Sequence, residues 1–193
     1  NYLRAAHYAD YAIGKFIDDL KEKGLYDDSL IVLYGDHSAV PKVDMESLLD
    51  FLDMEYSDLE WTKLQKVPLV IHYPGLMNGE TISTAGGQID ILPTIANLMD
   101  FDTPYAFGHD LINSKKGYAI LKNGSIVTDE FIYVNDTHQI FDKDGNELDF
   151  EDYKDEITGY LDELALSNMI IEKDAFRQFT IDSIVNSTIN SAN

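Results

Sequence analysis

The stretch IVLYGDHSAV, residues 31–40, decides the fold and points to a site. Its first four residues continue an apolar run that starts at Leu30, and this run over 30–34 predicts a short strand buried on both faces, as in the middle of an α/β sheet. Gly35 allows the chain to turn sharply directly after this strand. Asp36 and His37 follow at its carboxyl end, where open α/β sheets bind their ligands. The predicted fold class is therefore α/β.

Asp36 and His37 are candidate metal ligands. Neighbouring side chains in a strand point to opposite faces, but in a turn just past a strand both can converge on one point. A carboxylate oxygen with an imidazole nitrogen suits Zn²⁺ or Mn²⁺, whereas Mg²⁺ alone prefers oxygen ligands. The alternative is structural: Asp36 caps a turn and His37 is a partly buried histidine.

The segments around this strand fit the same α/β layer. Apolar residues spaced by three and four predict an amphipathic helix over about 2–23, directly before the strand. After it, residues 44–60 predict an acidic surface helix and residues 67–72 a second short strand. A further helix is predicted over 90–99, with Asp90 as its N-cap.

Beyond residue 115 the pattern changes to that of short antiparallel strands. Residues 118–121 and 126–127 flank Asn123-Gly124, which predicts a hairpin with a type I′ turn. Further strands are predicted at 131–134 and 139–141, and helices at 149–168 and 173–188. We thus expect an α/β layer over 1–115, and a small antiparallel sheet with C-terminal helices over 116–193.

Composition excludes several classes of function. The chain has 14 Lys and Arg against 35 Asp and Glu, a net charge of −21, which argues against nucleic-acid binding because Lys and Arg supply the contacts to phosphates. It has no cysteine, so disulfide and thiolate chemistry are excluded. No apolar run approaches the roughly 20 residues of a membrane span. The sequence starts inside a helical pattern, so we expect a fragment of a longer protein.

Four blocks of sequence carry a family resemblance. They are YADYAIGKFIDDLKEKGLYDDSLIVLYGDHS from residue 8, VPLVIHYPG at 67–75, GGQIDILPTIANLMDF at 86–101 and FGHDLI at 107–112. In this order they resemble the C-terminal half of the catalytic domain of lipoteichoic acid synthases. Those enzymes are membrane-anchored phosphoglycerol transferases of the sulfatase and alkaline phosphatase superfamily. The resemblance implies part of a sulfatase-like sandwich, and it covers about residues 2–112.

The resemblance also implies a chemistry. Asp36 and His37 match the family's Asp and His ligands of one divalent cation, usually Mn²⁺, with Mg²⁺ or Zn²⁺ as other candidates. The family's remaining Glu ligand and its nucleophilic Thr lie earlier in its chain, so we expect no catalytic nucleophile here and an inactive, soluble fragment. The parent protein would move glycerophosphate from phosphatidylglycerol to a polymer or glycan acceptor. It would do so at the extracytoplasmic face of the cell membrane, anchored by N-terminal helices absent here.

Other residues carry weaker predictions. His72, at the end of the second strand, either touches phosphate in the same crevice or is a structural strand-end residue, which we favour. The Gly86-Gly87-Gln88 turn could offer amides to an anion, but a tight turn into the next helix is the simpler interpretation. His109 is expected to fix a loop.

Two alternatives to the transferase remain open at this point. One is a soluble sulfatase or phosphodiesterase that uses the same metal ligands. The other is a non-catalytic accessory domain that keeps the fold but not the chemistry. Ser38-Ala39, which follow the Gly-Asp-His motif, depart from the aromatic residue or glycine often found there in the family, and this departure bears on substrate preference.

Overall fold

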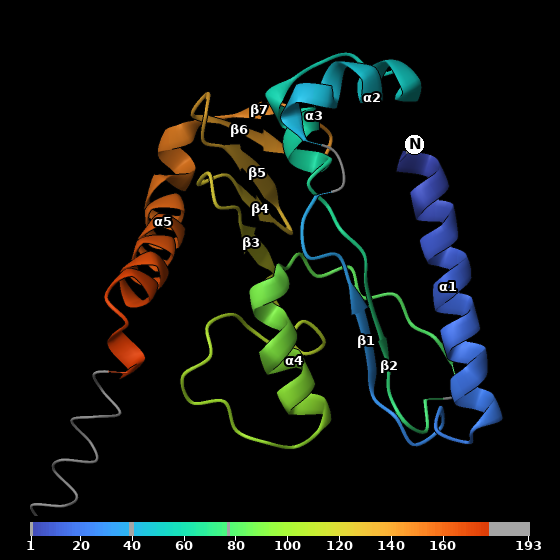
Figure 1. Ribbon diagram of the computed structural model, residues 1–193. Helices are drawn as coiled ribbons and strands as arrows, with labels where there is room; N and C mark the ends of the chain where they lie inside the picture. Colours follow the sequence, from blue (N-terminus) through green and yellow to red (C-terminus); the bar gives the residue numbers. More distant parts are fainter. Residues whose placement is uncertain (1, 39–40, 77, 178–193) are drawn as a thin grey trace, which may run out of the picture.

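Two antiparallel sheets organise the chain in the computed structural model, which describes residues 2–38, 41–76 and 78–177 (Figure 1). The first sheet is a ribbon of two strands, β1 (Ile31–Tyr34) and β2 (Leu69–His72), with Tyr34 opposite Leu69 and Ile31 opposite His72. The second has five strands in sequence order: β3 (Tyr118–Ile120), β4 (Ile126–Thr128), β5 (Phe131–Val134), β6 (Gln139–Asp142) and β7 (Glu147–Leu148).

Helices connect and flank these sheets. The helix α1 (Tyr2–Glu22) runs along one side of the molecule and leads into β1 (Figure 1). Between β1 and β2 lie the short 3-10 helix η1 (Lys42–Asp44) and the helices α2 (Met45–Leu52) and α3 (Asp58–Lys63). The 3-10 helix η2 (Gln88–Asp90) and α4 (Ile91–Leu98) follow β2, and α5 (Phe150–Glu172) follows β7.

The strand predicted over 30–34 is confirmed as β1, one residue shorter at its start, but its predicted burial is wrong. The side chains of Leu33 and Tyr34 are 40% and 48% exposed, and β1 pairs with β2 in antiparallel fashion. The physical reason is that this ribbon has only two strands among the described residues, so its faces stay open to solvent. The apolar stripe of α1 is open as well, with Phe16 55% exposed.

The core sits on the five-stranded sheet. On one face, Ile157 of α5 packs with the fully buried Ile126, Phe131 and Ile140 of the central strands. On the other face, Leu59 of α3 packs with two β5 side chains. Each fully buried side chain of this size contributes about 1.5–3 kcal/mol. The sheet therefore lies between α5 and α3. This packing fixes the position of α3 relative to the sheet.

Several boundaries differ from the predictions for physical reasons. The predicted helix over 44–60 is two helices, because Asp53 adopts a left-handed conformation that ends α2. In the β3–β4 hairpin only Gly124 has a positive φ, so the predicted type I′ turn is wrong: the turn has the left-handed residue at its end, as in a bulged hairpin loop. The helix α5 continues to Glu172, and most of the helix predicted over 173–188 lies outside the described residues.

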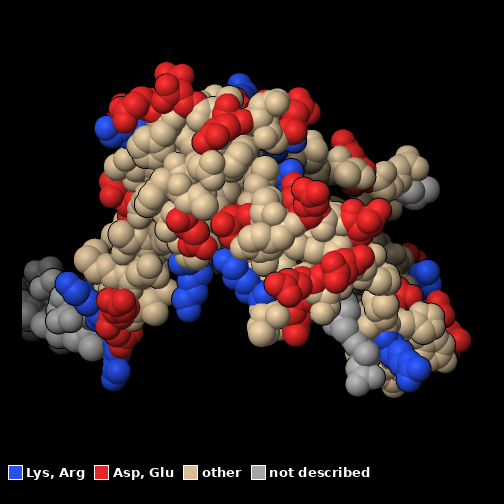
Figure 2. Space-filling model, turned by 90° about the horizontal axis from the view of Figure 1, so that it is seen from above, with Lys and Arg blue, Asp and Glu red and all other residues tan. Residues whose placement is uncertain are grey.

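Acidic side chains are spread over the surface rather than gathered in one patch on the face shown in Figure 2. Their distribution fits the net charge of −21 and favours solubility through self-repulsion. No helix within the described part of the chain has the length and apolar character needed to cross a bilayer.

Candidate metal centre

Asp36 and His37 lie side by side just past the carboxyl end of β1. The His37 Nε2 is 3.6 Å from Asp36 Oδ1, and the two side chains are 78% and 84% exposed. The bend that follows Tyr34 allows this, since in a continued strand the two side chains would point to opposite faces. A carboxylate oxygen and an imidazole nitrogen thus open onto the same volume of solvent.

The imidazole of His37 is held in one orientation by the backbone of the next residue, Ser38. Its Nδ1 lies 2.8 Å from the carbonyl oxygen of Ser38. A carbonyl only accepts, so Nδ1 carries the proton and donates this hydrogen bond. In the neutral imidazole, the Nε2 atom then keeps its lone pair, on the side of Asp36. This is the tautomer and orientation that metal-ligating histidines use.

The donor set fits part of a divalent metal site and not a whole one. Among the residues that the structure describes, no group of three or more His, Asp or Glu side chains is placed to hold a metal ion. A catalytic divalent ion needs three or more protein ligands. Asp36 and His37 could supply two of them, an oxygen and a nitrogen, which suits Mn²⁺ or Zn²⁺.

The backbone directly before Asp36 is held from two directions. The Gly35 N–H donates to the Pro68 carbonyl at 3.1 Å, which continues the β1–β2 pairing by one residue. Its carbonyl oxygen accepts a hydrogen bond from Gln88 Nε2, also at 3.1 Å. Gly35 does not adopt the left-handed conformation. It is required because a Cβ atom here would lie 2.7 Å from the Cβ of Val67.

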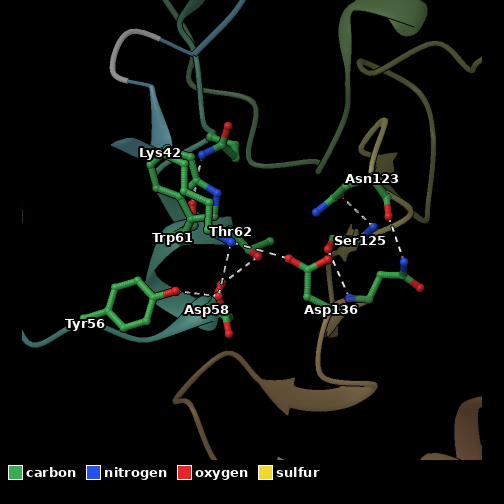
Figure 3. Close-up of polar contacts among 10 residues, drawn as sticks. Lys42, Tyr56, Asp58, Trp61, Thr62, Asn123, Ser125 and Asp136 are labelled. Atoms are coloured by element: carbon green, nitrogen blue, oxygen red, sulfur yellow. Dashed lines mark hydrogen bonds and ion pairs between the residues drawn. The ribbon is translucent and has the colours of Figure 1, made fainter. Parts of the chain in front are cut away.

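Downstream of the pair, Lys42 anchors the chain to two other elements (Figure 3). Its Nζ lies 3.6 Å from Asp58 Oδ1, at the start of α3, and 3.5 Å from Asp136 Oδ2, in the β5–β6 turn. The Tyr56 hydroxyl donates to the same Asp58 oxygen at 2.8 Å. Partial burial lowers the pKa of Lys42, but Tyr56 and the two carboxylates outweigh it and raise that pKa above its ordinary value.

Ala39 of the Ser38-Ala39 departure lies outside the described residues.

His72 lies at the opposite end of the ribbon from Asp36 and His37. The antiparallel register pairs it with Ile31, the first residue of β1. Its Nε2 lies 3.0 Å from the Tyr26 carbonyl oxygen, and its ring stacks on the Tyr26 ring with 4.0 Å between centroids. The expectation of a shared crevice does not fit this geometry, and we assign His72 the structural role.

Asp90 anchors the segment that carries Gln88. Its carboxylate accepts hydrogen bonds from the N–H groups of Gly87 at 2.7 Å and His109 at 2.8 Å, and its side chain is 1% exposed. The His109 Nδ1 is 3.0 Å from Asp90 Oδ1, although at an angle that leaves both ring nitrogens without a hydrogen-bond partner among the described residues. Asp90 thus holds the turn and the loop at 109, rather than the first amides of α4.

Sequence reasoning missed Gln88 and Lys42. Each acts on a partner far away in sequence, 53 residues for Gln88 and 94 residues between Lys42 and Asp136. Neither residue type is unusual at an exposed position, so no local signal marks them. Only the block GGQID, which links Gln88 to the buried Asp90, hints that this turn has a fixed conformation.

Comparison with known proteins places these features in a family. The family model described as "Sulfatase" matches residues 1–101. The lipoteichoic acid synthase-like protein YvgJ of Bacillus subtilis is 36% identical over 91% of this chain, and the lipoteichoic acid synthase of Staphylococcus aureus (strain USA300) is 32% identical over 91%. The chain spans about 30% and 28% of these two proteins.

A solved structure is similar along most of the chain. The crystal structure of the lipoteichoic acid synthase LtaP from Listeria monocytogenes superposes with a TM-score of 0.73 at 31% sequence identity. The match covers 87% of this chain and 44% of that one. The match leaves more than half of the solved protein without a counterpart here.

Proposed function

The chain belongs to the sulfatase family, and on this premise we propose that it is the C-terminal part of a phosphoglycerol transferase. The homology to lipoteichoic acid synthases supports the class of enzyme. The parent protein would transfer glycerophosphate from phosphatidylglycerol, or a similar anionic lipid, to a polymer or glycan acceptor outside the cell. Helices preceding this chain would anchor it in the membrane.

The observation that carries the proposal is the pairing of Asp36 and His37 past the end of β1. Both side chains are exposed, and the hydrogen bond from His37 Nδ1 to Ser38 leaves Nε2 ready to bind an ion. When bound, a divalent cation such as Mn²⁺ would lower the pKa of a nucleophilic hydroxyl and stabilise charge on phosphoryl oxygens. Asp36 would neutralise part of the ion's charge, and His37 would supply a nitrogen ligand.

The remaining machinery would come from residues outside this chain. Within the described residues two candidate ligands are brought together, and a third is not. The resemblance assigns a Glu ligand and a nucleophilic Thr to a preceding segment. The 193-residue chain alone should therefore bind Mn²⁺ weakly and catalyse nothing, because two ligands rarely hold an ion.

We also propose a domain boundary near residue 115. Residues 1–115 would form the C-terminal half of the catalytic domain, since β1, the loop with Asp36 and Gln88 all lie there. Residues 116–193 would form a smaller module built on the five-stranded sheet. Its buried core of Ile126, Phe131 and Ile140 supports this division.

The test is an assay on the full-length parent protein. We would measure diacylglycerol released from labelled phosphatidylglycerol with Mn²⁺, with a chelator, and with Mn²⁺ restored. Metal-dependent release is expected, and Asp36→Ala should lower it about a thousandfold or more, since a metal supplies several kcal/mol of transition-state stabilisation. Asp27→Ala, which removes an exposed carboxylate before β1, is the matched control and should leave the rate unchanged.

Two other results would replace the proposal. The match of residues 1–101 to the sulfatase family favours a hydrolase as the second candidate. Metal-dependent hydrolysis of an aryl sulfate or a simple phosphodiester, without diacylglycerol release, would establish that candidate. Absence of all turnover in the intact parent would leave a non-catalytic accessory domain.

A further inference from the structure

Asp36 and His37 have almost no packing of their own to orient them. Their side chains are 84% and 78% exposed, so their directions depend on the backbone of residues 35–38. The β1–β2 pairing fixes one side of this backbone through the Gly35 N–H. The carbonyl group of Gly35 belongs to the next peptide group, which joins Gly35 to Asp36. That carbonyl accepts from the side chain of Gln88.

Gln88 is itself placed by a rigid turn. The N–H of Gly87 is bound by the buried carboxylate of Asp90, which also binds the N–H of His109. The backbone of Gly108 packs against the same carboxylate. Its φ is +84°, and a Cβ atom there would lie 2.5 Å from Asp90 Oδ1, so the close approach requires glycine. The backbone of Gln88 is thus set by a buried charged group that donors contact from two segments of the chain.

This turn is also tied to the five-stranded sheet. The Asp129 carboxylate, in the turn between β4 and β5, accepts hydrogen bonds from the N–H groups of Ala85 at 2.7 Å and Gly117 at 2.6 Å. Ala85 lies three residues before Gln88. Hydrogen bonds therefore hold the segment 85–90 to the five-stranded sheet at Ala85 and to the Gly35 carbonyl at Gln88.

From this geometry we propose that Gln88 is a positioning residue for the Asp36–His37 pair, a role that rests on the proposed metal site. Gln88 holds the Gly35–Asp36 peptide plane so that the carboxylate and the His37 Nε2 face the same point. Its hydrogen bond is exposed and adds little to the stability of the fold. Its contribution is to orient the two metal ligands, and substitution of groups that orient metal ligands commonly changes metal affinity by 10–100-fold.

The test uses the 193-residue chain and NMR. Gln88→Ala should shift the amide signals of Asp36, His37 and Ser38 and speed their hydrogen exchange several-fold, while the urea midpoint of unfolding stays the same. Added Mn²⁺ should broaden the His37 ring signals, and the variant should need about tenfold more Mn²⁺ for the same broadening. Gln88→Glu keeps the size of the side chain but lacks the donor, so it should behave like the alanine variant.

Gln65→Ala is the matched control. Gln65 Nε2 donates to the Trp61 carbonyl at 3.1 Å, the same kind of bond at the same length, but within the region of α3. This variant should leave the signals and the Mn²⁺ response of His37 unchanged.

The outcomes separate the two claims. Unchanged amide signals and exchange at 36–38 in both Gln88 variants would overturn the positioning role. If Mn²⁺ fails to broaden His37 in the unsubstituted chain at any concentration, while the Gln88 variants still alter residues 36–38, the metal site fails and Gln88 is confirmed as the residue that sets this backbone. In the parent enzyme, Gln88→Ala should lower kcat and leave KM nearly unchanged, since it contacts no substrate.

Discussion

The hydroxyl of Tyr118 donates a hydrogen bond to Glu163 Oε2 at 2.8 Å and so ties β3 to α5. The Tyr118 ring also contacts two others: it stacks on His109 at 4.9 Å and lies tilted against Tyr160 at 4.5 Å between ring centroids. One residue thereby connects the long C-terminal helix, the five-stranded sheet and the loop that Asp90 holds. The first prediction concerns this connection.

Tyr118 should resist ionisation at alkaline pH. Burial, then the hydrogen bond to Glu163, raises the pKa of its hydroxyl well above the ordinary value of 10, and burial raises the pKa of Tyr160 in the same direction. Absorbance titration should show tyrosines that stay neutral when exposed ones have ionised. Because the folded pKa is raised, the stabilisation is present below pH 10 and is lost as pH rises toward the folded pKa.

Tyr118→Phe gives this prediction its control. It should remove one late-ionising tyrosine and cost about 1 kcal/mol of unfolding free energy, the usual value of a hydrogen bond. Tyr8→Phe alters a side chain that is 70% exposed on α1 and should cost nothing measurable. Equal costs for the two variants would contradict the role given to the Tyr118–Glu163 bond.

Asp90→Ala should destabilise the fold strongly. The carboxylate is buried and accepts from two backbone N–H groups, which would lose their partner. Hydrogen bonds to a charged group are worth about 1.5–3 kcal/mol, so urea denaturation should show a loss of at least that size. Asp110→Ala removes a carboxylate that accepts from Ile112 and Asn113 at an exposed turn, and it should cost less than about 1 kcal/mol. The reverse ranking of the two variants would refute this account of the turn.

Lys42 and Asp136 should couple weakly and in a salt-dependent manner. Both side chains are about half exposed and lie 3.5 Å apart. Double-mutant cycles on such pairs give about 0.2–1 kcal/mol, and salt screens them. A cycle of Lys42→Ala and Asp136→Ala at low salt should fall in this range and shrink toward zero near 1 M salt. Coupling that persists in high salt would mean that the pair is buried from solvent, which would contradict the exposure of both side chains in the structure.

Asp142 should stay ionised to lower pH than an ordinary aspartate. It accepts from the side chain and the backbone N–H of Asn146, at 2.9 and 2.8 Å, and these bonds lower its pKa below 3.8. Its stabilising contribution is therefore present above pH 3.8 and is lost as pH falls through the folded pKa. NMR titration of the Asp142 carboxyl carbon checks this. Asn146→Ala removes the side-chain donor and should raise the midpoint; an unchanged midpoint would assign the shift to some other cause.

The sequence was sufficient for the elements with strong local signals. The helix expected over 2–23, the strands after residue 115 and the Asp36–His37 position all depend on spacing and turn residues within a short window. The structure places α1 over Tyr2–Glu22 and a bend at residues 36 and 37 in agreement. Local spacing carries this information because helices and turns close their hydrogen bonds within a few residues.

Burial and long-range contacts could not be predicted in this way. The apolar run at 30–34 has the composition of a buried strand, yet Tyr34 is 48% exposed, because burial depends on what packs against a strand and not on the strand itself. The same holds for Gln88 and Lys42, whose partners are 53 and 94 residues away. His72 shows the related limit on register: its position opposite Ile31 follows from antiparallel pairing, which the strand sequence does not specify.

The most direct test of the central claim is an anomalous diffraction map of the parent protein crystallised with Mn²⁺. We expect a single strong manganese peak within coordination distance, roughly 2.0–2.3 Å, of an Asp36 carboxylate oxygen and of His37 Nε2. His37 Nδ1 should remain bonded to the Ser38 carbonyl. A manganese peak elsewhere in the protein, with Asp36 and His37 free of metal, would contradict the account.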